Sequence, residues 1–255
     1  MSKPFPRIVA CALAILVAAA LRAEPAVIGL ARAYLGPDST LSGIKAIHFV
    51  GTLDRVDPDN GGVPMHGSLD LVFVKPLRQR LSVHMDKTSL TTVLDGYDAW
   101  DFLQDNADHS KFELKWLSAG DIKTLRANTW ENLYFFRGLE GEGAIVDKGP
   151  ATVDGVACEK VDFSHGPGIV YERYFDRDTG RLVLTVRGPE TIRESGEILV
   201  DGLRFSRTIT SDTKMPSGKD LISTVTFSSI AINEPVSPDA FVAPDIVAAK
   251  QPPAK

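Results

Sequence analysis

The sequence predicts a mainly β protein with some α structure: an antiparallel sheet, an N-terminal helix and one interior helix. Three patterns lead to this fold class. Apolar and polar residues alternate with a period of two through most of the chain, as they do in antiparallel strands with one buried face. Turn-forming pairs such as Asp95-Gly96 and Asp154-Gly155 separate these stretches at short intervals. Between them, residues 119–137 repeat their apolar positions with helical spacing.

Residues 1–23 have the composition of an export signal. Lys3 and Arg7 form a short basic start, an unbroken apolar run follows over residues 8–21, and Ala23 ends the segment with a small side chain. A membrane-spanning helix needs about 20 apolar residues, so this run is short for an anchor, although an uncleaved anchor stays open as the alternative. We therefore expect a cleaved signal peptide and an exported, periplasmic protein.

The rest of the chain has the composition of a globular protein. The 255 residues are 44% hydrophobic and 24% charged, and the net charge is -5. Basic residues are dispersed among acids, which excludes the clustered positive charge of nucleic-acid-binding proteins. No linker or repeat divides the sequence. We expect one domain over residues 24–246, a disordered tail over 247–255, and a monomer with no nucleic-acid partner.

Two segments are predicted to be helical. Residues 25–36 start with Pro25, which suits the first helical position, and stop at Gly36-Pro37. Residues 119–137 follow Ser118 and Asp121, whose spacing resembles a capping box with Asp in place of Glu. At about 100° per residue this second helix has one apolar stripe with two aromatic residues beside it. The stripe consists of Ile122, Leu125, Thr129, Leu133 and Phe136, and the flanking residues are Trp130 and Tyr134.

The remaining segments are predicted to be strands of one meandering sheet. Tight turns rich in Gly, Asp and Pro separate most of them. The predicted strands are residues 44–53, 68–74, 78–85, 91–104 (with a turn at Asp95-Gly96), 143–149, 156–163, 168–175, 181–187, 195–201, 203–212 and 220–232.

Asp178-Thr179-Gly180 fits three interpretations: the catalytic turn of an aspartic protease, part of a calcium loop, or a hairpin turn. A protease needs two such aspartates that share a proton, and the chain has one copy of the motif. A calcium loop needs more oxygen ligands than Asp176 and Asp178, with a bidentate Glu that does not occur at the required offset. Asp and Gly are typical turn residues, so the sequence favours a hairpin.

Motifs for catalysis, metal binding or nucleotide binding do not occur in this sequence. The histidines lack the spacing of zinc ligands, and no nucleophile elbow, P-loop or dinucleotide fingerprint is present. Cys158 lies in a strand-like stretch and is expected to be a buried small side chain. We expect no cofactor, no metal, no catalytic residue and no enzymatic activity. The histidines are His48, His66, His84, His109 and His165.

Four stretches together resemble the outer-membrane lipoprotein-sorting superfamily, the LolA/LolB-like proteins. Residues 92–103 (TVLDGYDAWDFL) resemble its strand, Asp-Gly turn and aromatic strand. Residues 175–186 and 196–210 resemble its paired strands around D-x-x-T-G and a second turn. Residues 226–244 (TFSSIAINEPVSPDAFVAP) resemble its closing strand, with an Asn and a final Phe-x-x-Pro.

The resemblance implies an antiparallel, incompletely closed β-barrel, a half-barrel whose mouth is covered by the helices at 25–36 and 119–137. It also implies a periplasmic carrier of lipid or lipoprotein acyl chains that contributes to outer-membrane lipoprotein sorting. An arginine that latches the lid is expected, with Arg80 and Arg126 as candidates. Apolar residues that would line the cavity or its lid are Phe49, Trp100, Phe102, Leu125, Trp130, Leu133 and Phe136.

Two other classes of function stay open at this point. One is a non-catalytic envelope scaffold that binds protein partners through its sheet edge or lid. The other is a periplasmic hydrolase whose reactive residues meet only in the folded protein. An apolar cavity favours the carrier, an exposed apolar patch favours the scaffold, and a polar pocket with perturbed acids favours the enzyme.

Overall fold

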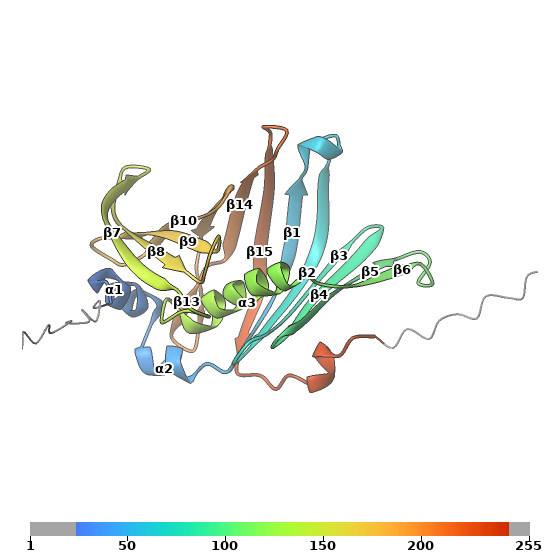
Figure 1. Ribbon diagram of the computed structural model, residues 1–255, viewed down its shortest axis with the longest axis horizontal. Coiled ribbons are helices and arrows are strands. Elements are labelled where there is room, and N and C mark those ends of the chain that lie inside the picture. The colour runs from blue at the N-terminus through green and yellow to red at the C-terminus, as the bar shows by residue number, and fades with distance from the viewer. Residues whose placement is uncertain (1–23, 245–255) are drawn as a thin grey trace, which may run out of the picture.

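In the computed structural model, which describes residues 24–244, most of the chain forms one 13-stranded antiparallel sheet (Figure 1). The expectations for residues 1–23 and 247–255 lie outside the described residues. The main sheet contains β1 (Ala46–Val56), β2 (Pro64–Val74), β3 (Arg78–Met85), β4 (Thr88–Asp95), β5 (Asp98–Asp105), β6 (Phe112–Trp116), β7 (Ala144–Val153), β8 (Val156–Ser164), β9 (Val170–Asp176), β10 (Leu182–Arg187), β11 (Glu190–Ser195), β14 (Thr208–Lys214) and β15 (Asp220–Ile232).

The sheet consists of two meanders that meet at the pair formed by β1 and β15. The first meander runs outward from β1 to β6, and the second runs from β7 back to β15. The strands β6 and β7 therefore lie at opposite edges, and the sheet does not close into a barrel. Helix α3 (Ala119–Tyr134) connects these two edges and crosses one face of the sheet (Figure 1). This is the incompletely closed antiparallel barrel that the sequence predicts.

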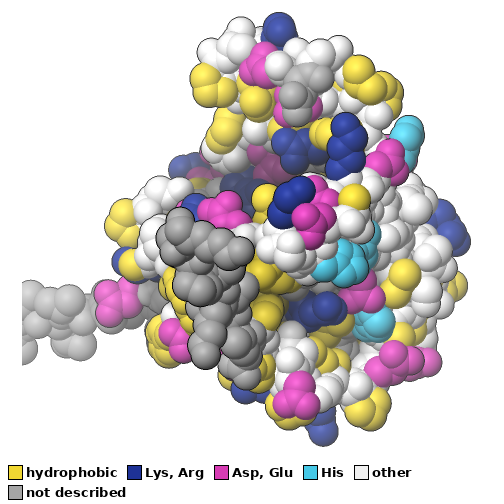
Figure 2. Space-filling model, turned by 90° about the vertical axis from the view of Figure 1, so that its right-hand side faces the viewer, with side chains coloured by type: hydrophobic (Ala, Val, Ile, Leu, Met, Phe, Trp, Pro, Cys, Tyr) yellow, Lys and Arg dark blue, Asp and Glu magenta, His cyan; other side chains and the backbone are white. Residues whose placement is uncertain are grey.

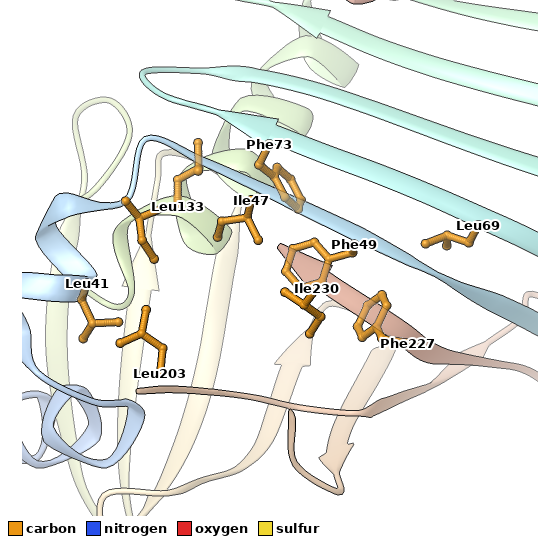
Figure 3. Packing of buried hydrophobic residues seen from close by; sticks show 10 residues of the cluster. Leu41, Ile47, Phe49, Leu69, Phe73, Leu133, Leu203, Phe227 and Ile230 are labelled. Atoms are coloured by element: carbon orange, nitrogen blue, oxygen red, sulfur yellow. The ribbon is translucent and has the colours of Figure 1, made fainter. Parts of the chain in front are cut away.

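We call the face that carries α3 the inner face, because both arms of the sheet contact the helix there. Leu133 of α3 packs with residues of β1 and β2, whereas Ala127 packs with Val161 and Phe163 of β8. A sheet whose two arms contact the same helix must be concave toward that helix. Figure 3 shows the first of these cores, where Phe49 lies beside Ile230 and Phe227.

The N-terminal helix is confirmed as α1 (Ala26–Leu35), with Pro25 at its N-cap. Its buried face packs on β8 and β9 through Val27, Ile28 and Ala31. A short helix that the sequence did not predict, α2 (Asp38–Gly43), begins directly after Pro37. The Gly-Pro pair thus ends one helix and starts the next, since Gly36 is the C-cap of α1 and Pro37 is the N-cap of α2. No helix in residues 24–244 is long and apolar enough to span a membrane.

The interior helix is three residues shorter than predicted. It is capped by Ser118, whose hydroxyl accepts the main-chain N–H of Asp121 at 3.2 Å, and it ends at Tyr134. Phe135 and Phe136 then adopt left-handed backbone angles, with φ of 49° and 67°. Side-chain size and chirality make this conformation unfavourable for Phe, so sequence alone favours a continued helix. The reversal still brings Phe136 into the core, where its ring packs against Phe175 at 5.0 Å.

One pair of predicted strands leaves the main sheet. β12 (Ile198–Val200) and β13 (Leu203–Phe205) form a separate two-stranded hairpin between β11 and β14, which pair directly with each other. The hairpin turns its apolar residues onto the core of the inner face, where Leu203 is fully buried. The prediction of a single meander was therefore wrong at this point. A hairpin in the main sheet and a hairpin folded over it have the same local alternation.

Asp178-Thr179-Gly180 forms the turn between β9 and β10, as the sequence favours. The Asp176 carboxylate accepts the main-chain N–H groups of Asp178 and Thr179 at 2.9 and 3.0 Å. The bond from Thr179 is the main cause that lowers the pKa of Asp176. Gly180 has φ of 76° and contacts α1 so closely that a Cβ atom there would lie 2.3 Å from the main-chain carbon of Leu30. The turn therefore docks the N-terminal helix.

Candidate functional site

An apolar row crosses the inner face over six adjacent strands. The register places Phe227 of β15 opposite Gly51 of β1, which is opposite Leu69 of β2. The row then continues through β3, β4 and β5 by direct cross-strand pairing. Because side chains alternate between the two faces, residues paired in this way point to the same side of the sheet. The row consists of Phe227, Gly51, Leu69, Val83, Leu90 and Leu103.

The row becomes more exposed with distance from the centre of the sheet. Phe227 and Leu69 are buried, with 4% and 6% of their surfaces exposed, whereas Leu90 and Leu103 are 38% and 40% exposed. Apolar side chains on a concave, partly open face form a surface that favours another apolar molecule, since burial removes them from water. We call these residues the apolar row.

A cavity lies next to the buried end of the row. It has a volume of about 130 Å³, and Phe227 and Phe49 form part of its wall. A wider opening of about 320 Å³ leads to the surface between α1, the β9–β10 turn and the β12–β13 hairpin. The two spaces share lining residues and therefore adjoin each other; we call the smaller one the chamber, the larger one the mouth, and both together the passage. The shared residues are Leu35, Phe136, Leu182, Glu194, Arg204, Phe205 and Ser206.

Arginines hold the covers of this passage to one another. Arg32 of α1 is buried and donates from Nη1 to the main-chain oxygens of Tyr134 and Phe135 at 3.1 and 2.7 Å. Its side chain also forms an ion pair with Asp38 at 2.5 Å. The hydrogen bond from Arg32 is the largest cause that lowers the pKa of the Asp38 carboxyl. Near the C-terminal end of α1, Arg204 of the hairpin donates to the main-chain oxygen of Tyr34 at 2.6 Å.

The side of α3 that faces β8 and β9 carries a buried charge network. The Glu131 carboxylate contacts Nε2 of His165 at 2.5 Å and is paired with Arg173. His165 Nδ1 lies 3.0 Å from the main-chain nitrogen of Glu140 and 3.2 Å from its main-chain oxygen, which holds the imidazole ring in place beside Glu131. Burial alone would raise the pKa of Glu131, but Arg173 and His165 outweigh it and hold that pKa below its usual value. A carboxylate inside the protein therefore stays ionised.

The two arginines predicted as lid latches have different positions. Arg126 lies on α3, donates to the main-chain oxygen of Gly96 at 2.6 Å and forms an ion pair with Glu140 at 2.5 Å. It therefore joins α3 to the turn between β4 and β5. Arg80 lies on the opposite face of the sheet, 3.6 Å from Asp70, and has no contact with the helix among these interactions.

Four of the predicted cavity and lid residues lie on or beside α3. Leu133 is fully buried in the core of the inner face with Phe49. Phe136 contributes to both the chamber and its mouth. Leu125 is half-buried on α3, and Trp130 stacks on Tyr134 at 3.7 Å with part of its surface exposed.

The structure places Trp100 and Phe102 on the outer face, away from the other predicted residues. Trp100 pairs with Val93, which pairs with Arg80, so all three point away from α3. The C-terminal segment covers this patch, and Phe241 packs on it. A one-residue change of strand register exchanges the two faces, so alternation alone cannot assign an apolar stripe to one of them.

Arg32 and the network around Glu131 were not predicted from the sequence. Both depend on partners that are far apart in the chain, such as Arg32 with Phe135 and Glu131 with Arg173. No local signal existed for Glu131, because at about 100° per residue it lies opposite the apolar stripe, where a charged side chain is expected to face water. In residues 24–244 no group of three or more His, Cys, Asp or Glu side chains has the arrangement of a metal site. Burial raises the pKa of the Cys158 thiol, which is unfavourable for a nucleophile.

The fold is similar to that of three solved structures. A LolA superfamily protein from Nitrosomonas europaea matches with a TM-score of 0.55 and 10% identity, over 84% of this chain and 97% of the other. A DUF1329 family protein from Desulfovibrio piger matches with a TM-score of 0.54 and 12% identity, over 85% of this chain and 96% of the other. A putative outer membrane lipoprotein-sorting protein domain from Vibrio parahaemolyticus matches with a TM-score of 0.53 and 9% identity, over 84% of this chain and 95% of the other.

No protein-family model matches the sequence, and no curated protein matches it either. The chain has a LolA-like fold, as the motif resemblance implies. Identity near 10% establishes the architecture, and the function has to be argued from the site.

Proposed function

We propose that this protein is a non-catalytic periplasmic carrier that binds acyl chains of lipids or lipoproteins and contributes to lipoprotein sorting toward the outer membrane. The observation that carries the proposal is the apolar row on the inner face, which continues from the chamber wall at Phe227 to the half-exposed Leu103. An acyl chain is a linear apolar ligand, and the row is a linear apolar surface. The LolA-like fold supports this function, and the basic and apolar pattern of residues 1–23 supports export.

The energy of binding would come from removing methylene groups from water. Each buried CH₂ contributes about 0.8 kcal/mol, so a chain that covers the row gains affinity in proportion to its length. Leu90 and Leu103 already form an exposed apolar pair, which a bound chain would shield. The site thus needs no catalytic group and no cofactor.

The chamber is small for a complete ligand. Its volume of about 130 Å³ lies below the range of about 300–1,000 Å³ that is usual for ligand sites. A chain that enters from the mouth would therefore have to displace part of the cover. The β12–β13 hairpin forms no strand pairing with the main sheet, and one apolar face and the bond from Arg204 to Tyr34 hold it in place. We infer that its movement admits the acyl chain.

Binding can be tested with a fluorescent fatty acid on protein purified without detergent, together with native mass spectrometry for co-purified lipid. Leu90→Lys places a charge in the middle of the apolar row and should abolish or strongly weaken binding. The position is 38% exposed, so its effect on folding should be small. The matched control is Ile222→Lys, because Ile222 is 43% exposed on the outer face.

Equal binding by the two variants would contradict the row as the acyl site, and no binding by the wild type would contradict the carrier function. The sorting role needs a further comparison. Binding of a triacylated lipoprotein peptide should exceed binding of the free fatty acid if lipoproteins are the cargo. The reverse order would favour free lipid.

A further inference from the structure

The strand β6 is an open edge of the main sheet. It is the terminal strand of the sheet and pairs with β5 alone. All of its residues except Leu114 are exposed, including the large apolar side chains of Phe112 and Trp116, at 42% and 60%. Figure 2, which faces this side of the molecule, shows hydrophobic side chains at the surface among charged ones. A free edge with exposed aromatic residues is a template for pairing with another strand.

The opposite edge of the sheet is protected, and β6 is not. β7 contains Pro150, which has no N–H to donate, and an irregular register at Asp147 and Gly149. Proline and bulges at an edge prevent pairing with a further strand. β6 has neither feature, as it pairs with β5 in continuous register from Phe112 to Trp116.

The hydrogen-bond pattern shows which groups of β6 point outward. Asp105 donates its N–H to the main-chain oxygen of Lys111, and Leu117 donates its N–H to that of Ala99. The odd-numbered residues of this strand therefore bond to β5, because bonding alternates along an antiparallel pair. The N–H and C=O groups of the even-numbered residues, Phe112, Leu114 and Trp116, point away from the sheet.

We propose that the protein forms a two-fold symmetric dimer through antiparallel pairing of β6 with β6 of a second copy, centred on Leu114. The segment Phe-Glu-Leu-Lys-Trp is complementary to itself in this arrangement. Glu113 of one copy lies opposite Lys115 of the other, in both directions. Phe112 lies opposite Trp116, and the outward-pointing groups of the even-numbered residues bond to each other across the axis.

The side-chain contacts across the new strand pair are favourable on both faces of the sheet. Glu113 and Lys115 occupy a position without mutual main-chain hydrogen bonds, where opposing side chains lie closest and opposite charges attract. On the outer face, Phe112 and Trp116 extend the patch that already holds Phe102, whose ring is 5.6 Å from that of Phe112. Pairing removes these aromatic surfaces from water, and aromatic pairs across strands are stabilising.

The proposal does not depend on acyl binding, and it replaces the expectation of a monomer. The two-fold axis of this dimer passes through the edge strand β6. The inner faces and passages of both copies therefore stay accessible to a ligand. Other occupants of the same edge, such as a strand of an envelope protein or a membrane surface, would leave the purified protein monomeric.

Charge reversal at the two positions provides the test. The oligomeric state of purified full-length chains is measured over a concentration series by sedimentation or by light scattering after size exclusion, at one low salt concentration. Glu113→Lys opposes Lys to Lys, and Lys115→Glu opposes Glu to Glu, so each single variant should dissociate at least about tenfold more readily than the wild type. The double variant Glu113→Lys/Lys115→Glu restores both opposite pairs and should dimerise like the wild type.

Mixing the two single variants gives a second, independent result. Each single variant should dimerise less readily alone than in the mixture, because Glu113→Lys places two lysines on one edge and Lys115→Glu places two glutamates on the other, so the mixture should form heterodimers. A monomeric wild type at all concentrations would overturn the proposal. A dimer that persists unchanged in both single variants would also overturn it, because the interface would then lie elsewhere. Circular dichroism of each variant confirms that the fold is intact.

Discussion

Arg32 of α1 donates a hydrogen bond from Nη1 to the main-chain oxygen of Phe135, 2.7 Å away, directly after the last residue of α3. The oxygen belongs to the first of two phenylalanines with positive φ. Left-handed backbone costs about 1–3 kcal/mol for such a residue, so the surrounding structure must stabilise it. Arg32 does so by satisfying carbonyl groups that the end of a helix leaves without partners. The N-terminal helix therefore fixes the end of the helix that covers the sheet.

We expect Arg32→Met to loosen this joint. Met retains most of the apolar stem and removes the charged donors. Because hydrogen bonds to charged groups contribute about 1.5–3 kcal/mol, a loss of that size in the free energy of unfolding should follow. Hydrogen exchange should become faster at the C-terminal end of α3. The control is Arg80→Met on the outer face, which should change the stability by less than about 0.5 kcal/mol. Equal effects would show that Arg32 is not a joint.

Leu133→Ala should have the full cost of a core truncation. Leu133 is fully buried among residues of β1 and β2, so its removal leaves a cavity and should cost about 2–5 kcal/mol of unfolding free energy. Leu125 lies on the same helix but is only half-buried, and Leu125→Ala should cost clearly less. Denaturant unfolding of both variants measures the difference. A small effect of Leu133→Ala would mean that α3 is a loosely held lid along its whole length.

Glu131→Gln should destabilise the protein by about 3–5 kcal/mol at neutral pH, because it leaves Arg173 buried without its counter-charge. The pKa of Glu131 is lowered in the folded protein, so its contribution is complete above the ordinary value of 4.5. That contribution is lost as the pH falls from 4.5 through the lower folded value. The difference in stability between wild type and variant should therefore shrink in acid. A difference that is constant between pH 7 and pH 3 would contradict the assignment.

Gly180→Ala should lower the free energy of unfolding by more than the positive φ of this residue alone explains. A Cβ atom there collides with the main chain of α1, at 2.3 Å from Leu30. Gly218 has φ of 80° and no atom within 4 Å of such a Cβ. Gly218→Ala therefore measures the cost of a positive φ for Ala without any collision. We expect Gly180→Ala to cost at least about 1–3 kcal/mol more than Gly218→Ala in thermal or denaturant unfolding. Asp178→Asn in the same turn should change little, because Asn also suits turns.

The local patterns located most elements of secondary structure. Alternation with a period of two located most of the strands, and the helical stripe with its Ser118 cap located α3. The short helix α2 and the strands β6 and β11 were not predicted. The order of short motifs indicated the LolA-like fold even though the identity to solved structures is near 10%. These signals are local because each depends on neighbours within a few residues, which the sequence contains directly.

The position of each apolar stripe was decided by tertiary structure. Phe49 and Trp100 stand in equally clear alternating patterns, yet they lie on opposite faces of the same sheet. The β12–β13 hairpin folds over the inner face, whereas neighbouring strands with the same alternation join the main sheet. In each case the free energy that stabilises the observed packing comes from contacts between segments far apart in the chain. Local sequence determines that an apolar face exists, and only the packing of distant segments determines what that face covers.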